Sequence, residues 1–427
     1  MTYVFKTPDT PEYGEDIATL LNRVFHPQKV GDLARTFFNH LPGLENHHWF
    51  TMADASTGEP VSTLTLIPWT WEACGIRLKV AEMGLVGTLD TCRGKGMMKK
   101  LNTHFDAHVK EHGYDLCIIQ GIPGFYHNFG YHYAIALENH IDLPLALIPT
   151  HGTTAGTGGG FRFRRADHND IGFLMGQDAD YRNANTFSVF RSRAEWEYML
   201  VRRPETEYGS DFWIMEALDG TPMCYARVLF DGFGNGLILS EVSEGITHEG
   251  FAALAAFLKS MALAQEKPHI RLNLHPGSPA GQMALAMGAA QTRPYAWQTK
   301  IPDRVRLLDR LTPLLEKRLE SSMFKNYTGK LRLNLYTETI DLEFIRGKII
   351  VNQGNGSDAE QMFSIPKDLF GALVLGHRSW DDLQQCRPDI FPANQYLRFK
   401  PAVLPDEAGL LVDVLFPRTR SWIYERF

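Results

Sequence analysis

The feature that most constrains this chain is an internal duplication on either side of a glycine-rich break. The break is Thr150–Gly160, which has five glycines in eleven residues and no hydrophobic periodicity, so it predicts a flexible linker. A helical pattern contains Asp16–Leu20 before the break, and Asp170–Leu174 occupies the corresponding place after it. A chain that repeats itself builds its architecture from copies of one unit, so we expect two related domains.

The same order of elements continues in both halves. Trp49–Val61 and Trp213–Pro222 each carry an apolar segment followed by a turn, which predicts a hairpin. Each half then has a strand, an amphipathic helix, a second strand and a second helix. The break itself has one other interpretation, a phosphate-binding loop. However, Gly156-x-Gly158 lacks a third glycine at the required offset, and no apolar strand runs directly into it.

The last third of the chain has a different pattern. From about Leu331 apolar residues alternate with polar ones, which predicts three short strands around 331–335, 340–344 and 349–351. Ile365–Gly376 has a proline near its start, a glycine at its end and apolar spacings of three and four, which predicts a helix. The expected fold class is therefore α+β, with two tandem mixed-sheet domains at 1–150 and 151–300 and a small α+β domain at 301–427.

Composition and charge exclude several classes of protein. Hydrophobic residues make up 44% of the chain and charged residues 22%, which excludes disorder, collagen and coiled coil. The 43 basic and 49 acidic residues give a net charge of −6, without the basic excess that a duplex nucleic acid or an anionic membrane requires. No apolar run approaches the roughly 20 residues of a membrane span. We therefore expect a cytoplasmic protein, with its five cysteines reduced and mostly buried.

The most informative stretch is Met83–Leu101, in which an apolar strand runs into a glycine-broken turn and then into a helix. Unpaired N–H groups and the positive end of the helix dipole suit a pyrophosphate at such a helix start. Arg93, Lys95 and Lys99 add positive charge there. A plain turn with solvated basic residues explains the same stretch equally well, so these residues alone leave both interpretations open.

A second stretch favours the phosphate site. The apolar pattern of Tyr114–Gln120 predicts a buried strand. The following segment, Gly121–Tyr131, predicts a loop and a short helix that ends at Gly130. The order strand, Arg-x-x-Gly turn, helix, strand, Tyr-x-x-x-Gly-aromatic resembles the GNAT family of acyl-CoA-dependent N-acetyltransferases. The length, the duplication and the third domain resemble its Eis-like branch. That resemblance implies two GNAT-like domains, of which the first is active, and a C-terminal domain similar to sterol carrier proteins.

The resemblance also implies where acetyl-CoA binds. The pantetheine is expected beside the strand backbone at Val86, Gly87 and Thr88, and Gly121 and Ile122 are expected to contact the same arm. The pyrophosphate is expected beside Arg93, on the amides of Gly94, Lys95, Gly96, Met97, Met98 and Lys99. Met98 stands where most of the family has glycine or alanine, although bulky residues occur there in the Eis-like branch.

Tyr126 matches the family's tyrosine that protonates the departing CoA thiolate. The chemistry supports this role, because a thiolate leaves more easily when a positioned O–H gives it a proton. The alternative is a core aromatic residue whose hydroxyl is satisfied by a backbone carbonyl.

The attacking amine must also lose a proton. The Eis-like branch assigns this step to the carboxylate of the C-terminal residue, which is Phe427 here. Three aromatic residues among the last six favour a docked terminus. We expect that the neighbouring Arg426 could pair with the carboxylate and weaken it as a base.

Other candidate sites are weaker. His104, His108 and His112 recur every four residues, but their helix must also cover a sheet, so surface or half-buried histidines are expected and no metal. In the second half, no Arg-x-x-Gly precedes the helix around Phe251–Leu258, and Ala284 stands at the position of Tyr126. That half is expected to be a copy without a CoA site.

The expected function is direct transfer of acetyl from acetyl-CoA to a primary amine, by a transferase that needs no metal. The negative charge favours a cationic acceptor such as an aminoglycoside-like amine, a polyamine or a lysine, with no nucleic acid or membrane partner. The resemblance further implies a homo-oligomer, with a hexamer as the expected form. The alternative is a non-catalytic CoA-fold protein that binds an apolar ligand through its C-terminal domain.

Overall fold

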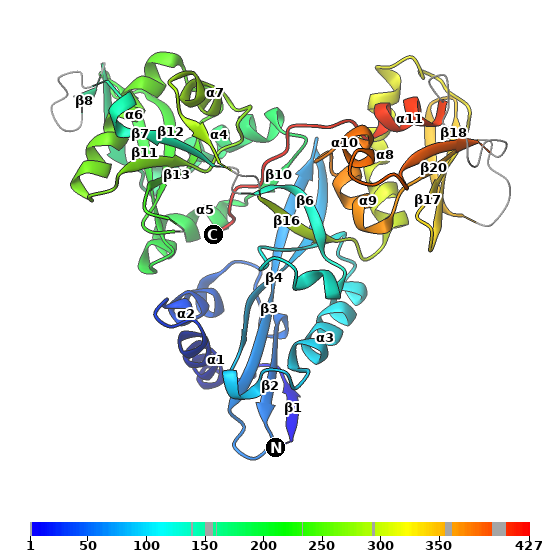
Figure 1. Ribbon diagram of the computed structural model, residues 1–427. Helices are drawn as coiled ribbons and strands as arrows, with labels where there is room; N and C mark the ends of the chain where they lie inside the picture. Colours follow the sequence, from blue (N-terminus) through cyan, green and yellow to red (C-terminus); the bar gives the residue numbers. More distant parts are fainter. Residues whose placement is uncertain are drawn as a thin grey trace.

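The computed structural model describes residues 2–137, 140–149, 157–158, 160–232, 234–292, 295–354, 361–394 and 407–427. These residues form three sheets, each covered by helices, arranged as three lobes (Figure 1). Most of the expected linker at 150–160 lies outside the described residues. No helix in these ranges is both long and apolar enough to cross a membrane.

The first sheet has eight strands among the described residues, and its long central hairpin is β3 and β4. Helices α1 (Pro11–Val24) and α2 (Val30–His40) cover one face, and α3 (Met97–Glu111) covers the other (Figure 1). The strands, in sheet order, are β1 (Tyr3–Lys6), β2 (Trp49–Asp54), β3 (Pro60–Ala73), β4 (Ile76–Thr88), β5 (Leu116–Ile119), β16 (Tyr295–Lys300) and β6 (His132–Leu137), with β10 (Phe187–Phe190) on β3.

Strand β5 shows why this sheet is buried on both faces. Leu116 and Ile118 pack into the core under α1 and α2, whereas Cys117 and Ile119 pack into the core under α3. Successive side chains of a strand point to opposite faces, so a strand covered on both sides is apolar at every position. The sequence predicted this buried strand correctly.

The second sheet repeats the order of the first. Strands β13 and β14 are parallel and joined by α6, as β4 and β5 are parallel and joined by α3. Its strands are β15 (Ala290–Gln291), β7 (Ile141–Pro144), β14 (His269–Leu272), β13 (Leu237–Val242), β12 (Pro222–Leu229), β11 (Ser210–Ala217), β9 (Phe161–Arg165) and β8 (Thr157–Gly158); its helices are α4 (Ile171–Ala184), α5 (Arg193–Val201), α6 (His248–Ala264) and α7 (Pro279–Ala286).

The first two lobes exchange strands across the expected boundary at 150. Strand β16 lies between β5 and β6, and β10 pairs with β3, so both complete the first sheet. In the other direction, β7 pairs with β14 in the second sheet. Each of these two lobes therefore contains strands from both sides of residue 150, and neither lobe corresponds to one continuous segment.

The third lobe confirms the three predicted strands and the predicted helix. The strands are β17 (Gly329–Asn334), β18 (Thr339–Ile345) and β19 (Lys348–Gln353), and the helix is α9 (Lys367–Val374), which begins after Pro366. The sheet continues with β20 (Gln361–Ser364) and β21 (Phe391–Asn394), and the other helices are α8 (Arg304–Glu320), α10 (Trp380–Gln384) and α11 (Glu407–Leu415). Its likeness to sterol carrier proteins remains a prediction.

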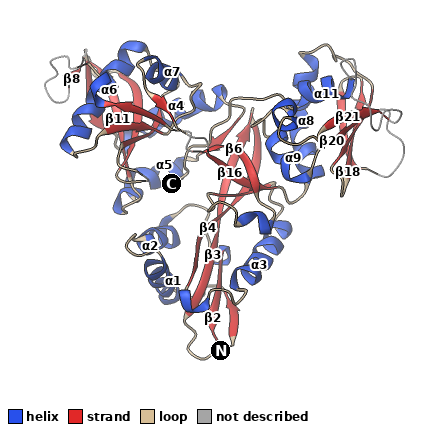
Figure 2. Ribbon diagram, viewed as in Figure 1, coloured by secondary structure: helices blue, strands red, loops and turns tan. Residues whose placement is uncertain are grey.

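After α11 the chain returns as a loop to the other lobes and ends near α5 (Figures 1 and 2). The loop is bound to β10 and the residue before it by two backbone hydrogen bonds, from Thr186 N to Arg420 O at 2.8 Å and from Trp422 N to Phe187 O at 3.2 Å. Trp422, Ile423 and Tyr424 are buried. This confirms the docked terminus that the aromatic residues indicated.

Candidate active site

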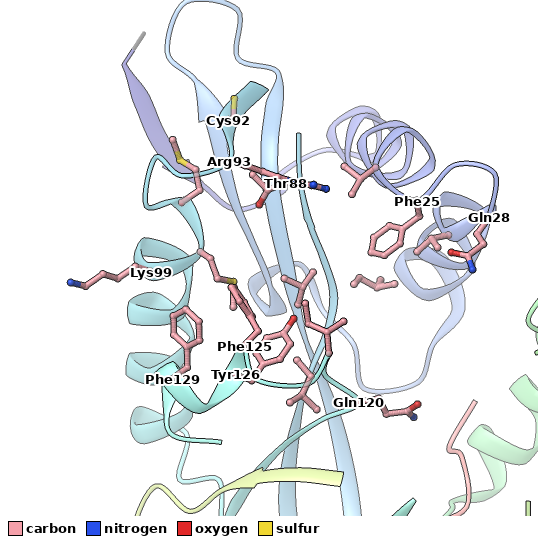
Figure 3. Close-up of a pocket in the computed structure, with 18 of the residues that line it drawn as sticks. Phe25, Gln28, Thr88, Cys92, Arg93, Lys99, Gln120, Phe125, Tyr126 and Phe129 are labelled. Carbon is pink, nitrogen blue, oxygen red and sulfur yellow. The ribbon is translucent and has the colours of Figure 1, made fainter. Parts of the chain in front are cut away.

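A cavity of about 1040 Å³ lies in the first lobe, where β4 and β5 separate (Figure 3). The two strands pair at three positions, the last being Glu82 with Ile118, after which β5 ends at Ile119 while β4 continues to Thr88. In the described part of the chain, no strand pairs with this edge of β4 beyond Glu82. A bulge at Leu85, where φ is 49°, bends the unpaired end of β4.

The cavity brings together most of the residues that the sequence singled out. Those that line it are Val86, Thr88, Arg93, Gly94, Gly96, Met97, Met98, Lys99, Ile122 and Tyr126. Gly87, Lys95, Gly121 and Phe427 do not line it. Gly87 instead lies under α1, since a Cβ there would come within 3.1 Å of Leu21 Cδ2. Lys95 turns aside and donates from Nζ to the Tyr3 hydroxyl at 3.1 Å.

The turn before α3 is open and unblocked. Gly94 and Gly96 have φ of 74° and 75°, which favours glycine, and a Cβ at either position would meet no atom within 4 Å. Gly96 is the N-cap and contributes no side-chain cap, and the first turn carries no acidic residue. The first N–H groups of α3 and the positive end of its dipole are therefore available to an anion.

The start of α6, the matching helix of the second lobe, is closed in comparison. The hydroxyl of Thr247 accepts from Gly250 N at 3.1 Å, and Glu249 adds a negative charge in the first turn. Both features remove what makes the start of α3 suitable for a phosphate. The absence of a CoA site from the second lobe stays a prediction.

Tyr126 lies in the short helix Tyr126–Phe129, and its hydroxyl points into the cavity (Figure 3). The side chains of Phe125 and Tyr131 pack edge-on against its ring, at centroid distances of 5.0 and 6.3 Å. The hydroxyl forms no hydrogen bond with any described residue, and burial raises its pKa to about 12. At neutral pH it is therefore a protonated donor without a partner.

Gly121 positions this tyrosine. A Cβ at Gly121 would lie 2.2 Å from Cδ2 of Tyr126, so only glycine allows the ring to pack there. The carbonyl of Gly121 accepts from Gln298 Nε2 at 2.7 Å and from the Tyr295 hydroxyl. The loop that carries Tyr126 is thus fixed by β16, a strand that the sequence assigned to the other domain.

Glu82 is a residue that the sequence reasoning missed. It is buried at the point where β4 and β5 part, and its Oε2 accepts from Trp69 Nε1 at 2.8 Å. Burial, opposed by this hydrogen bond, raises the pKa of its carboxyl to about 7. A single carboxylate within the apolar run Val80–Val86 was the signal that could have identified it.

The C-terminal residue is held by a different arginine from the one expected. Arg227 Nη2 donates to the Phe427 backbone oxygen at 3.0 Å, whereas Arg426 pairs with Glu195 and donates to the carbonyls of Pro42 and Pro68. The Phe427 ring packs edge-on against Phe37 and Trp69, at 4.6 and 5.7 Å. Trp69 therefore lies between the terminus and Glu82.

One comparison with known proteins concerns the part of the chain that contains this cavity. The sequence model of the acetyltransferase (GNAT) domain matches residues 8–134, the segment that contains the turn, Glu82 and Tyr126. The chain thus carries a GNAT domain, and it is an acetyltransferase enzyme. No protein with a curated description matches the sequence.

Solved structures extend the likeness of the fold to the whole chain. A probable N-acyltransferase from Enterococcus faecalis superposes with a TM-score of 0.68, a GCN5-related N-acetyltransferase from Kribbella flavida with 0.66, and Eis1 from Mycobacterium abscessus with 0.58. Each is 14% identical to this chain, and each match covers 100% of both chains. The arrangement of three lobes is therefore similar to theirs.

Proposed function

We propose that this protein transfers an acetyl group from acetyl-CoA to a primary amine by direct attack within a ternary complex. The observation that carries the proposal is the unpartnered Tyr126 hydroxyl, which points into a cavity with an open anion site at one end. A thioester bound there places its sulfur within reach of a proton donor.

In this proposal the pyrophosphate of CoA binds the amides at the start of α3, from Gly94 to Lys99. The pantetheine lies along the unpaired edge of β4 at Val86 and Thr88, where backbone N–H and C=O groups are free to pair with its amides. Gly121 acts indirectly, because its carbonyl is already taken by Gln298 and its Cα packs on Tyr126. Gly87 and Lys95 contribute through the backbone.

The reaction needs one group that gives a proton and one that removes a proton. Tyr126 gives its proton to the departing thiolate as the tetrahedral intermediate collapses. Glu82, with a pKa near neutrality, is suited to remove the proton of the attacking ammonium through water. The carboxylate of Phe427 is the second candidate, although its hydrogen bond to Arg227 stabilises it as an ion and makes it a weaker base.

The lining of the cavity favours an amine on an apolar body. Val24, Phe25, Val30 and Leu33 of the α1–α2 region line the cavity, together with Tyr208 from the second lobe. No aspartate or glutamate among the described residues lines it; Glu82 is buried outside the lining, so a proton from the cavity would reach its carboxylate only through water. A polycation would therefore find no carboxylate in the lining of the cavity. In place of the cationic acceptor expected from the net charge, we propose an aryl- or alkylamine.

The test is release of CoA thiol from acetyl-CoA with a panel of amines: phenethylamine and hexylamine against spermidine and an aminoglycoside. We expect faster turnover with the apolar amines. Faster turnover with the polycations would contradict the acceptor class but not the transferase. No thiol release with any amine, despite acetyl-CoA binding, would favour the binding-protein alternative. Assembly into a hexamer remains a separate prediction.

A further inference from the structure

A second cavity, of about 230 Å³, lies where the three lobes meet. Its wall includes Ile135 from β6 in the first lobe, His275 from the loop after β14 in the second, and Arg378 from the segment after α9 in the third. The loop that returns from α11 toward α5 (Figure 1) adds Arg418 and Thr419. This volume is below the roughly 300–1,000 Å³ of a typical small-molecule pocket, so the cavity suits a compact ligand.

The cavity is lined by positive charge that no carboxylate in its wall balances. Among the described residues, two arginines line it, Arg378 and Arg418, and no aspartate or glutamate does. Arg378 is half-buried, and its guanidinium forms no hydrogen bond or ion pair with any described residue. Arg418 lies 3.9 Å from Asp382 Oδ2, a distance too long for a hydrogen bond. In contrast, Arg420 on the same loop is paired with both carboxylate oxygens of Glu244 at 2.6 Å.

Neutral hydrogen-bond donors accompany the two arginines. Nδ1 of His275 accepts from Gly277 N at 2.9 Å, so in the neutral ring the hydrogen is on Nε2, which is a donor. The Ser421 hydroxyl also lines the cavity, and it accepts from Phe187 N at 3.3 Å. It lies 3.4 Å from Thr419 Oγ1, so one of these two hydroxyls keeps a hydrogen that the other does not use.

A fixed turn holds the two arginines beside the cavity. Gly376 has φ of 67°, and its carbonyl accepts from Thr419 N at 2.9 Å. A Cβ at this glycine would lie 2.2 Å from Thr419 Oγ1. The hydrogen bond joins the segment that carries Arg378 to the segment that carries Arg418. Two like charges held beside one cavity destabilise the folded chain unless an anion compensates them.

We propose that this cavity binds a compact anion that carries a phosphate group. Guanidinium groups suit this ligand because their planar N–H donors match the geometry of phosphate oxygens. The imidazole and hydroxyl donors supply further hydrogen bonds. No described residue lines both this cavity and the one that contains Tyr126, so the two sites are separate. Since the wall comes from all three lobes, the bound anion stabilises their arrangement.

The experiment is calorimetric titration of the full chain with inorganic phosphate at constant ionic strength, comparing wild type with Arg378→Gln and Arg418→Gln. Arg162→Gln is the matched control, because it removes an exposed arginine of β9 outside the cavity. Gly96→Glu is the second control, because it blocks the start of α3. We expect a site that both controls retain and that is at least about tenfold weaker in both cavity variants. Circular dichroism establishes that each variant is folded.

Glycerol phosphate in place of inorganic phosphate distinguishes the two sources of the ligand. Tighter binding of the ester would indicate a phosphorylated metabolite, and tighter binding of inorganic phosphate the free ion. Thermal unfolding provides a second readout: phosphate should raise the Tm of wild type and Arg162→Gln but not of Arg378→Gln.

Three results would overturn the proposal. They are equal phosphate affinity in all these proteins, no heat of binding in wild type with either ligand, and loss of binding in Gly96→Glu alone, which would assign the phosphate to the start of α3. None of these results depends on acetyl transfer.

Discussion

Replacing Glu82 by glutamine tests two effects of the buried carboxylate: its cost in folding free energy and its contribution to turnover. In the folded protein the pKa of Glu82 is about 7, against 4.5 without the influence of its surroundings. Below pH 4.5 both folded and unfolded chains hold the proton. As the pH rises from 4.5 to 7, the unfolded chain gives up this proton before the folded chain does, so the free energy of unfolding falls. Above pH 7 both forms are ionised, and the free energy of unfolding falls no further.

The difference in pKa corresponds to about 3 kcal/mol of folding free energy, of which about 2.5 kcal/mol falls between pH 5 and pH 8. Glu82→Gln does not titrate, and its amide oxygen can still accept from the Trp69 indole. We therefore expect the variant to gain about 2.5 kcal/mol relative to wild type between pH 5 and pH 8, measured by urea unfolding.

The same substitution should impair turnover. If Glu82 removes the ammonium proton, kcat/KM of wild type breaks near pH 7, and Glu82→Gln loses this break together with roughly 10²-fold or more of the activity. Glu59→Gln, an exposed carboxylate on the turn before β3, is the control and should change neither property. A constant stability difference at both pH values would refute the buried-carboxylate reasoning. An unchanged pH–rate profile would assign the base to the terminus.

Three further outcomes are expected. Tyr126→Phe should lower turnover by roughly 10²-fold or more with acetyl-CoA affinity near wild type, while Tyr133→Phe should not; unchanged turnover would make Tyr126 a core residue. Calorimetry should give one acetyl-CoA per chain, abolished by Gly96→Glu, which places a negative charge at the phosphate amides; two per chain would show that the second lobe also binds it. Deleting Phe427 should reduce turnover at neutral pH, with partial recovery at higher pH where more amine is unprotonated; superimposed pH–rate profiles would make the terminus a spectator.

The sequence by itself determined the features that depend on neighbouring residues. The turn at Gly94 and Gly96 needs positive φ, and the two glycines in the sequence indicate such a turn. The apolar run of β5 follows from burial of both faces of its sheet. The alternation of β17–β19 follows from burial of one face. The duplication was visible because both copies need the same local patterns to form the same elements.

Only the tertiary structure decided the features that depend on contacts distant in sequence. Strand β16 enters the first sheet and fixes Gly121 through Gln298, although 177 positions separate the two residues. Arg227 rather than the adjacent Arg426 holds the terminus, because the loop after α11 returns to β12. The pKa of Glu82 likewise follows from packing, since the burial of a side chain is set by how sheets and helices assemble and not by spacing along the chain.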